Sequence, residues 1–348
     1  THNVRKFIDD CLAGHVPFAV YMFPDDCKVN AVASATSHGE YGRDGSFFIN
    51  DFHNTFQPPL VINPDIDVDM ADGTSPQVPM VEPWAISTSR DSYSGNLQRL
   101  IDRLKASGGK TVYSRTICGD GRGIAWSGVA DSYFEAFPAT FRYIYYTPET
   151  GSWLGASPEL LLRRAAGSDV VETMALAGTR SDESRCGWDN KNIKEHDFVT
   201  KYISDTLARI GDSVVTGESH DVAYGAIRHL CHRISAHYGG DFIEALNALS
   251  PTPALAGFPV SEAMENIERY ESHRRGCYGG YVGVTDTSGE YAYVNLRSVN
   301  FSGSRYCIYA GGGITEDSDT ASEWDETERK VAVLRELINQ NLSNERQF

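Results

Sequence analysis

The sequence contains no long apolar run. Its longest runs fall far short of the roughly 18 residues that a membrane-spanning helix needs. The amino end, residues 1 to 5 (THNVR), also lacks the apolar segment of a secretory signal. We therefore expect a soluble, cytoplasmic protein that has no membrane partner.

Positive charge is scarce in this chain. Its 31 lysines and arginines stand against 47 aspartates and glutamates, which gives a formal net charge of -16. Nucleic acids and anionic membranes bind basic surfaces, so this balance argues against both as partners. A small anionic ligand would need local positive charge or a bound metal ion.

Paired cysteine motifs are absent as well, since none of the seven cysteines has Cys-x-x-Cys spacing. An odd, dispersed set is typical of reduced and mostly buried thiols, and not of a disulfide framework or a zinc cluster. The set comprises Cys11, Cys27, Cys118, Cys186, Cys231, Cys277 and Cys307.

The chain does have enough apolar residues for a substantial core, since 41% of its 348 residues are hydrophobic. Predicted helices and strands alternate without a repeat, a change in composition or a charged linker, which favours one mixed domain over residues 1–348. Residues 1–90 are expected to form short strands joined by long, partly proline-rich connections. Periodicity predicts helices at 94–105, 191–210, 225–238 and 322–340, and strands at 110–116, 140–146, 160–163, 170–175, 278–285, 290–300 and 305–310.

Two acidic segments stand out among the predicted helices. Glu323 and Glu326 are three residues apart, so both carboxylates project from one face of a helix that follows the glycines at 311–313. A second acidic helix contains Glu195. An acidic helix face is usually a solvated surface, but two such helices facing each other can hold a divalent cation.

Nine short motifs follow one another in a recognisable order. Together they resemble the chorismate-utilising enzymes, a family that includes isochorismate synthase, salicylate synthase, the anthranilate synthase large subunit and aminodeoxychorismate synthase. The resemblance covers about residues 90–340. The motifs are KTVYSR from Lys110, GASPE ending at Glu159, LAGTR at 176–180, Glu195-His196, His229-Leu230, PTPALAG at 251–257, Arg297, AGGGI at 310–314 and EWDET at 323–327.

This resemblance implies an α+β fold in a single chorismate-binding domain. Two stacked, mostly antiparallel β-sheets would be flanked by helices in four layers, α/β/β/α. Residues 1–90 would form the amino-terminal part of the fold, and residues 91–342 the catalytic part that carries the motifs.

The resemblance also implies a pair of catalytic residues. In the family a nucleophile adds at carbon 2 of the chorismate ring while the hydroxyl at carbon 4 leaves, which requires a base and an acid. Lys110 would be the base that activates water, and Glu159 the acid that protonates the leaving hydroxyl. Lys110 must then be neutral for part of the time, which burial or neighbouring cations favour, whereas Glu159 must keep its proton.

Magnesium is the cofactor that the family implies, and it prefers oxygen ligands. By resemblance, Glu195 and Glu326 bind it directly, and Glu323 binds it directly or through water. Many relatives carry an acid three residues before the first of these glutamates, where this chain has Asn192. The surroundings of the metal at that end of the site are therefore expected to differ.

The same comparison implies a set of substrate-binding residues. Arg297, expected on a strand, would bind a substrate carboxylate through two hydrogen bonds, and Lys330 would add positive charge one helical turn after Glu326. Glycines would let the main chain approach the ligand closely. His196 is expected to be structural. The full substrate set is Gly178, Thr179, His229, Ala254, Leu255, Arg297, Gly311, Gly312, Gly313 and Lys330.

Two positions distinguish between the reactions of the family. Some aminodeoxychorismate synthases use a nucleophilic lysine where this chain has Ala177, and the ammonia-using enzymes generally lack a lysine at the position of Lys110. Water is therefore the expected nucleophile, and isochorismate synthase the favoured reaction, with menaquinone or siderophore precursors as products. Salicylate synthase, which goes on to eliminate pyruvate, and a non-catalytic chorismate-binding protein remain as alternatives. We expect a monomer or homodimer without a glutamine amidotransferase partner.

Overall fold

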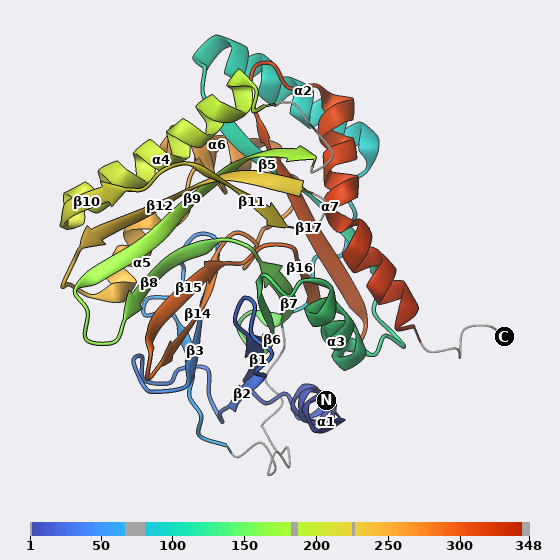
Figure 1. Cartoon of the computed structure of the whole chain (residues 1–348). Coiled ribbons are helices and arrows are strands. Elements are labelled where there is room, and N and C mark those ends of the chain that lie inside the picture. The colour runs from blue at the N-terminus through green and yellow to red at the C-terminus, as the bar shows by residue number, and fades with distance from the viewer. Residues whose placement is uncertain (1, 67–80, 182–186, 225–226, 343–348) are drawn as a thin grey trace.

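The computed structural model describes residues 2–66, 81–181, 187–224 and 227–342 (Figure 1). Helices and strands alternate along the chain, as the sequence predicts. The helices are α1 (His2–Gly14), α2 (Arg90–Ser107), α3 (Trp126–Ala136), α4 (Asn190–Ile210), α5 (Phe242–Leu249), α6 (Val260–Tyr270) and α7 (Thr320–Gln340).

The strands form two sheets. The first has the order β13-β5-β17-β16-β7-β6-β1-β2, and its strands are β1 (Phe18–Met22), β2 (Asn30–Ala33), β5 (Lys110–Asp120), β6 (Phe141–Thr147), β7 (Gly151–Ser157), β13 (Gly257–Phe258), β16 (Ser298–Phe301) and β17 (Arg305–Ile314). The second has the order β10-β12-β9-β8-β15-β14-β3-β4, with β11 paired to β12, and its strands are β3 (Ser46–Asn50), β4 (Leu60–Ile62), β8 (Leu160–Ala165), β9 (Val170–Ser181), β10 (Asp212–Thr216), β11 (His220–Tyr224), β12 (Ile227–His237), β14 (Tyr281–Asp286) and β15 (Gly289–Val294).

The two sheets pack face to face around an aromatic core. Strand side chains alternate between the two faces of a sheet, and on β6 Phe141, Tyr143 and Tyr145 point toward the other sheet, where they join Phe47 and Tyr293 in one buried cluster. Rings of Phe141 and Tyr293, one from each sheet, stack with centroids 4.3 Å apart. This core holds the two sheets together.

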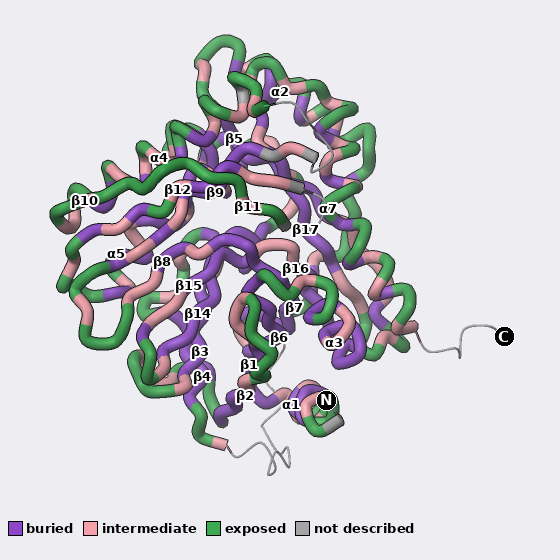
Figure 2. The backbone as a smooth tube through the Cα atoms, viewed as in Figure 1, coloured by how far each residue is buried: buried purple, intermediate pink, exposed green. Residues whose placement is uncertain are grey.

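Helices cover both outer faces of this sandwich. Buried side chains of α1, α3 and α7 pack on the first sheet, and those of α4 and α5 pack on the second. Helix α6 lies against β5 and β13 at the edge of the first sheet. Figure 2 shows the inner strands almost wholly buried, with exposed residues along the outer sides of the helices. The α+β fold with two mostly antiparallel sheets and flanking helices is confirmed.

The helix predicted at 94–105 illustrates how local sequence sets the elements. Leu97, Leu100 and Leu104 recur at helical spacing and are fully buried. The helix begins earlier, at Arg90, because the Ser89 side chain accepts a hydrogen bond from the main-chain N–H of Ser92 and caps the first turn. It ends before Gly108, whose φ of 71° suits a residue without a side chain.

Two predictions of secondary structure are wrong. The segment predicted as a helix at 225–238 is a strand, β12, within the described residues 227–237, because it pairs with β9 from Ile227 to His237 and this pairing overrides local propensity. The strand predicted at 290–300 is two strands, β15 and β16, which belong to different sheets. The chain crosses between the sheets at 295–297, where Arg297 has a φ of 48° that no regular strand contains.

The described residues of the amino-terminal part, 2–66 and 81–90, contribute strands to both sheets. Strands β1 and β2 extend the first sheet, and β3 and β4 extend the second. The expectation of strands and long connections there missed α1, which packs on the first sheet through Phe7, Ile8 and Cys11.

The cysteines agree with the expectation of free and mostly buried thiols. The six cysteines within the described residues are free, and four of them are buried, whereas Cys186 lies outside those residues. In the same part of the chain, every helix is too short or too polar to span a membrane.

Candidate active site

The predicted site residues gather at one end of the two-sheet sandwich. Strand β5 begins at Lys110 beside the carboxyl end of β17, where Gly313 lies opposite Val112. In the second sheet the carboxyl end of β9 lies beside the start of β12, with Ala177 opposite Leu230. Each pairing brings together residues that are far apart in the sequence, and the contact between Lys110 and Glu195 links the two sheets at this end.

Two crossovers between the sheets occur at this same end. The chain leaves β7 of the first sheet and enters β8 of the second through Pro158 and Glu159, and it returns from β15 to β16 through residues 295–297. The main-chain N–H of Val294 donates to the carbonyl of Glu159 over 3.0 Å, so the crossovers are hydrogen-bonded to each other. Glu159 and Arg297 therefore both lie where one sheet passes into the other.

Lys110 is buried at the start of β5 and is paired with a carboxylate. Its Nζ lies 2.5 Å from Oε1 of Glu195, and only 4% of the lysine side chain is exposed. Glu195 comes from α4, on the second sheet, so this ion pair joins the two halves of the site. The structure thus brings the predicted base and a predicted metal ligand into direct contact.

Glu159 is a buried carboxylic acid. Burial raises its pKa to about 8, although the positive charge of Lys110 acts in the opposite direction. A carboxyl group with this pKa is mostly protonated at neutral pH. It can therefore donate a proton, as the predicted role requires.

The glycine run of β17 allows charged side chains to approach the main chain. A Cβ atom at Gly313 would lie 2.4 Å from Cε of Lys110 and 3.1 Å from Oε1 of Glu195, and one at Gly312 would lie 3.1 Å from Oε2 of Glu323. A side chain at either position would displace these groups. The ligand-binding role of these glycines stays a prediction, and in the structure they leave room for Lys110 and the carboxylates.

Helix α7 directs three predicted residues toward this glycine run. Oε1 of Glu326 lies 3.5 Å from the Cβ position of Gly312, and Glu323 accepts a hydrogen bond from the Ser318 hydroxyl over 2.8 Å. Lys330 lies 2.7 Å from Glu326 and donates to the carbonyl of Gly311 over 2.8 Å. Partial burial opposes the charge of Lys330, but Glu326 outweighs this effect and the pKa of Lys330 is raised.

The three carboxylates predicted to bind metal do not converge on one point in the structure. Across the described residues, no group of three His, Cys, Asp or Glu side chains is arranged to hold a metal ion. Glu195 is paired with Lys110 and Glu326 with Lys330. A shared ion would require these two ion pairs to open.

His229 projects toward this group of charges from the second sheet. Its Nδ1 donates to the carbonyl of Gly178 over 2.9 Å, so Nε2 is the acceptor when the ring is neutral. Burial, together with the charges of Arg297 and Lys330, lowers the pKa of His229 to about 4. The side chain is therefore neutral at physiological pH, within electrostatic range of Arg297, Lys330 and Glu326.

Asn192, the residue at which the sequence departs from the family pattern, lies against Gly178. Gly178 has a φ of 74°, and a Cβ atom there would lie 3.3 Å from the Asn192 side chain. Asn192 also donates to the Asp189 carboxylate, the amino-terminal cap of α4. Asn192 thus packs against the end of β9 and stabilises the first turn of α4. The side chain of Thr179 lies outside the described residues.

Arg297 lies in a crossover and not on the predicted strand. Its left-handed backbone conformation breaks the strand, and its carbonyl accepts a hydrogen bond from the Tyr133 hydroxyl over 2.7 Å. The guanidinium carbon lies 5.9 Å from the ring centre of Phe137. The predicted carboxylate-binding role stays a prediction.

Ala254 and Leu255 lie on the segment that precedes β13. Leu255 is 3% exposed and belongs to the core of the second sheet, whereas Ala254 is only partly buried. The carbonyl of Leu255 accepts a hydrogen bond from Arg275 over 2.8 Å. Leu255 is thus held as a core residue, and the substrate-binding role of both residues stays a prediction.

Sequence reasoning missed a buried ionic cluster beside this segment. Arg275 donates to Glu271, to the Val112 carbonyl and to the Leu255 carbonyl, and Glu271 accepts from the Ser114 main chain and hydroxyl. Burial opposes the charge of Glu271, but Arg275 lowers its pKa below the usual value. The cluster fastens β5 to the segment before β13, and the run of polar residues at 271–275 (ESHRR) was the only signal for it.

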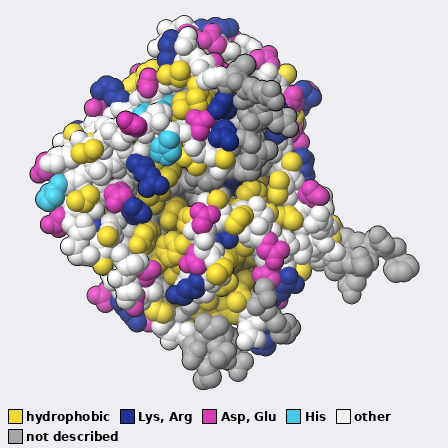
Figure 3. Space-filling view, viewed as in Figure 1, with side chains coloured by type: hydrophobic (Ala, Val, Ile, Leu, Met, Phe, Trp, Pro, Cys, Tyr) yellow, Lys and Arg dark blue, Asp and Glu magenta, His cyan; other side chains and the backbone are white. Residues whose placement is uncertain are grey.

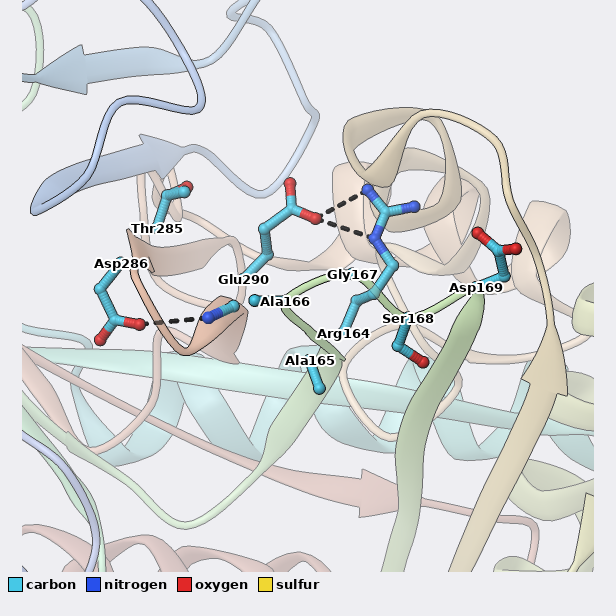
Figure 4. Close-up of a pocket in the computed structure, with 10 residues that line it drawn as sticks. Arg164, Ala165, Ala166, Gly167, Ser168, Asp169, Thr285, Asp286 and Glu290 are labelled. Carbon is cyan, nitrogen blue, oxygen red and sulfur yellow. Dashed lines mark hydrogen bonds and ion pairs between the residues drawn. The ribbon is translucent and has the colours of Figure 1, made fainter.

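A separate hollow lies at the opposite end of the second sheet. It has a volume of about 360 Å³ between the β8–β9 and β14–β15 turns (Figure 4). Arg164 and Glu290 satisfy each other there over 2.7 and 2.9 Å, and Asp286 accepts from the main chain of its own turn. These polar groups serve the turns, so the hollow does not belong to the predicted site.

Figure 3 shows how charged side chains are distributed on one face of the molecule. On the face drawn in Figure 3, the coloured acidic side chains are scattered among basic and apolar ones. At the end of β5 and β17, by contrast, Lys110 is paired with Glu195 and Lys330 with Glu326.

Known proteins are similar to this chain in sequence and in fold. Isochorismate synthase MenF of Haemophilus influenzae is 31% identical over 213 residues, which make up 57% of this chain and 48% of that protein. Anthranilate synthase component 1 of Aeropyrum pernix is 30% identical over 271 residues, or 72% of this chain and 60% of that protein. The chain therefore spans about half the length of the first relative and somewhat more of the second.

Among solved structures, the menaquinone-specific isochorismate synthase MenF of Escherichia coli superposes with a TM-score of 0.78 and 21% identity, covering 92% of this chain and 88% of that chain. At this identity the likeness establishes the fold. The family described as "Chorismate binding enzyme" matches residues 87–339, which contain every predicted site residue. With this match, and with the motifs gathered at one end of the same fold, the chain belongs to the chorismate binding enzyme family.

Proposed function

We propose that this protein is an isochorismate synthase, which converts chorismate to isochorismate. The observation that carries the proposal is the pair formed by Lys110 and Glu159, a buried amine and a buried, protonated carboxylic acid at the same end of the sandwich. Water addition with loss of a hydroxyl needs one group of each kind. The name of the Haemophilus influenzae relative supports the same reaction.

The proposed chemistry proceeds by paired proton transfers. Lys110 accepts a proton from a water molecule as its oxygen bonds to carbon 2 of the ring. Glu159 gives its proton to the hydroxyl at carbon 4 as that C–O bond breaks and the ring double bonds shift. One water enters and one leaves, so the net reaction is an isomerisation.

Magnesium is part of this proposal. Glu195, Glu323 and Glu326 supply carboxylate oxygens, the ligands that this ion prefers, and all three lie beside Gly312 or Gly313. When bound, the ion would supply the positive charge that holds a substrate carboxylate. Glu195 would then turn away from Lys110, which would leave the lysine amine available to water.

The product formed from chorismate tests the function. With chorismate and magnesium, the protein is expected to form isochorismate, detected by chromatography, without pyruvate. Release of pyruvate with fluorescent salicylate would identify a salicylate synthase. Failure to consume chorismate would favour a binding protein, and ammonia-dependent formation of anthranilate would also contradict the proposal.

Replacing Lys110 tests the base. Lys110→Ala is expected to lower kcat by roughly 10²- to 10⁴-fold, the usual contribution of a general base, while the circular dichroism spectrum stays unchanged. Lys105→Ala, at a lysine whose side chain is 57% exposed, is the matched control and should retain full activity. Wild-type turnover in Lys110→Ala would refute the assignment.

The pH dependence tests the acid. Glu159 donates only while it is protonated, and because its pKa is raised to about 8, kcat/KM should fall as pH rises through that value. The measurement is kcat/KM between pH 6 and 10, with thermal unfolding followed over the same range. Glu159→Gln should lose activity at every pH, and a variant that kept the wild-type profile would assign the descending limb to another group.

Neutralising one carboxylate tests the metal site. Glu326→Gln is expected to raise the KM for magnesium by roughly tenfold or more, since a ligand charge is lost. Glu336→Gln on the same helix, at a glutamate that contacts only Gln340 among the interactions described, provides the control. Equal magnesium dependence in the two variants would show that Glu326 is not a ligand.

A further inference from the structure

Arg115 ends the KTVYSR motif, and the proposed chemistry leaves it without a role. It lies on β5 opposite Ala310 of β17, and the residue is 2% exposed. Tyr113, two residues earlier, lies opposite Gly312, so Arg115 and Gly312 occupy the same face of the sheet. Helix α7 covers this face and carries Glu323 and Glu326 (Figure 1).

The Arg115 guanidinium contacts three residues of α7. Its Nε donates to the Thr327 hydroxyl over 2.6 Å, its terminal nitrogen is paired with Glu328, and its guanidinium carbon lies 3.8 Å from the ring centre of Trp324. Thr327 is fully buried and donates in turn to the carbonyl of Trp324 over 2.7 Å. A single buried side chain of the sheet therefore holds one turn of the helix at three points.

This turn is the one that carries the predicted metal ligands. An α-helix turns about 100° per residue, so a rotation of α7 by one position would carry Glu323 and Glu326 away from Gly312. The planar guanidinium can satisfy a hydroxyl, a carboxylate and an aromatic face at once only in one orientation of the helix. The same contacts also fix the distance between α7 and the sheet.

We propose that Arg115 is a positioning residue that sets the rotation of α7 and so holds the Glu323 and Glu326 carboxylates at Gly312. Arg115 contacts Trp324 and Thr327 of the EWDET motif. Trp324 lies between the two glutamates, and Thr327 directly follows Glu326. The inference rests on the proposed function, because it matters for catalysis only if the two carboxylates serve the reaction.

Three variants separate positioning from general stability. Arg115→Lys keeps a positive charge near Glu328 but loses the planar fork that also reaches Thr327 and Trp324. Thr327→Val keeps the branched shape and removes only the hydroxyl. Arg335→Ala is the matched control, because Arg335 also binds Glu328, over 2.8 Å, but belongs to α7 itself.

Magnesium affinity is the decisive measurement, taken by calorimetric titration with magnesium chloride and as the KM for magnesium in chorismate turnover. Arg115→Lys and Thr327→Val are expected to weaken magnesium binding by roughly tenfold, as expected when groups that orient metal ligands are lost. Arg335→Ala should stay within about twofold of wild type, as is usual for a surface ion pair. The midpoint of thermal unfolding, measured for each variant, shows whether any loss follows stability instead.

Wild-type magnesium affinity in both Arg115→Lys and Thr327→Val would overturn the inference while leaving the proposed function intact. An equal loss in Arg335→Ala would also overturn it, since the charge of Glu328 alone would then explain the effect. If Arg115→Lys fails to fold, Thr327→Val decides the question. A wild-type protein that does not convert chorismate would overturn the proposed function, and this inference with it.

Discussion

The pairing of β5 with β17 is the constraint on which the candidate site depends. Ten residue pairs, from Arg305 opposite Asp120 to Ile314 opposite Thr111, fix the two strands in one register. A slip of one residue would reverse the face on which every side chain lies. This single register places Lys110 at the glycine run and Arg115 beneath α7. Both faces of the strand pair therefore carry residues of the candidate site.

Charge at this end is balanced locally. Lys110 and Lys330 each contact a glutamate, whereas Glu159 and His229 are held uncharged by burial. Removing charges from water is costly unless they are paired, which explains why each lysine lies against a glutamate and why burial keeps Glu159 and His229 neutral. An anionic ligand and a cation would have to separate these ion pairs in order to bind. Under the proposed function, a chain with a net charge of -16 would accept an anionic ligand through these few residues.

Local sequence predicted the elements best where periodicity was strong and no distant pairing competed. The helix at 191–210 is an example, since Val199, Ile203 and Leu207 recur at helical spacing and are buried. The helix predicted at 225–238 is wrong within the described residues 227–237, because pairing with β9 makes them a strand. Prediction failed again at Arg297, because no local signal marks the point at which a chain passes from one sheet to another.

The sequence by itself determined the family, the order of the motifs and the candidate residues, because motifs and helical periodicity are local properties of a chain. The tertiary structure alone decided how those residues meet. It placed Lys110 against Glu195 across two sheets, raised the pKa of Glu159 by burial, and joined Arg115 to Thr327 of α7. These outcomes depend on contacts between residues 85 and 212 positions apart and on exclusion of water, neither of which is written in local sequence.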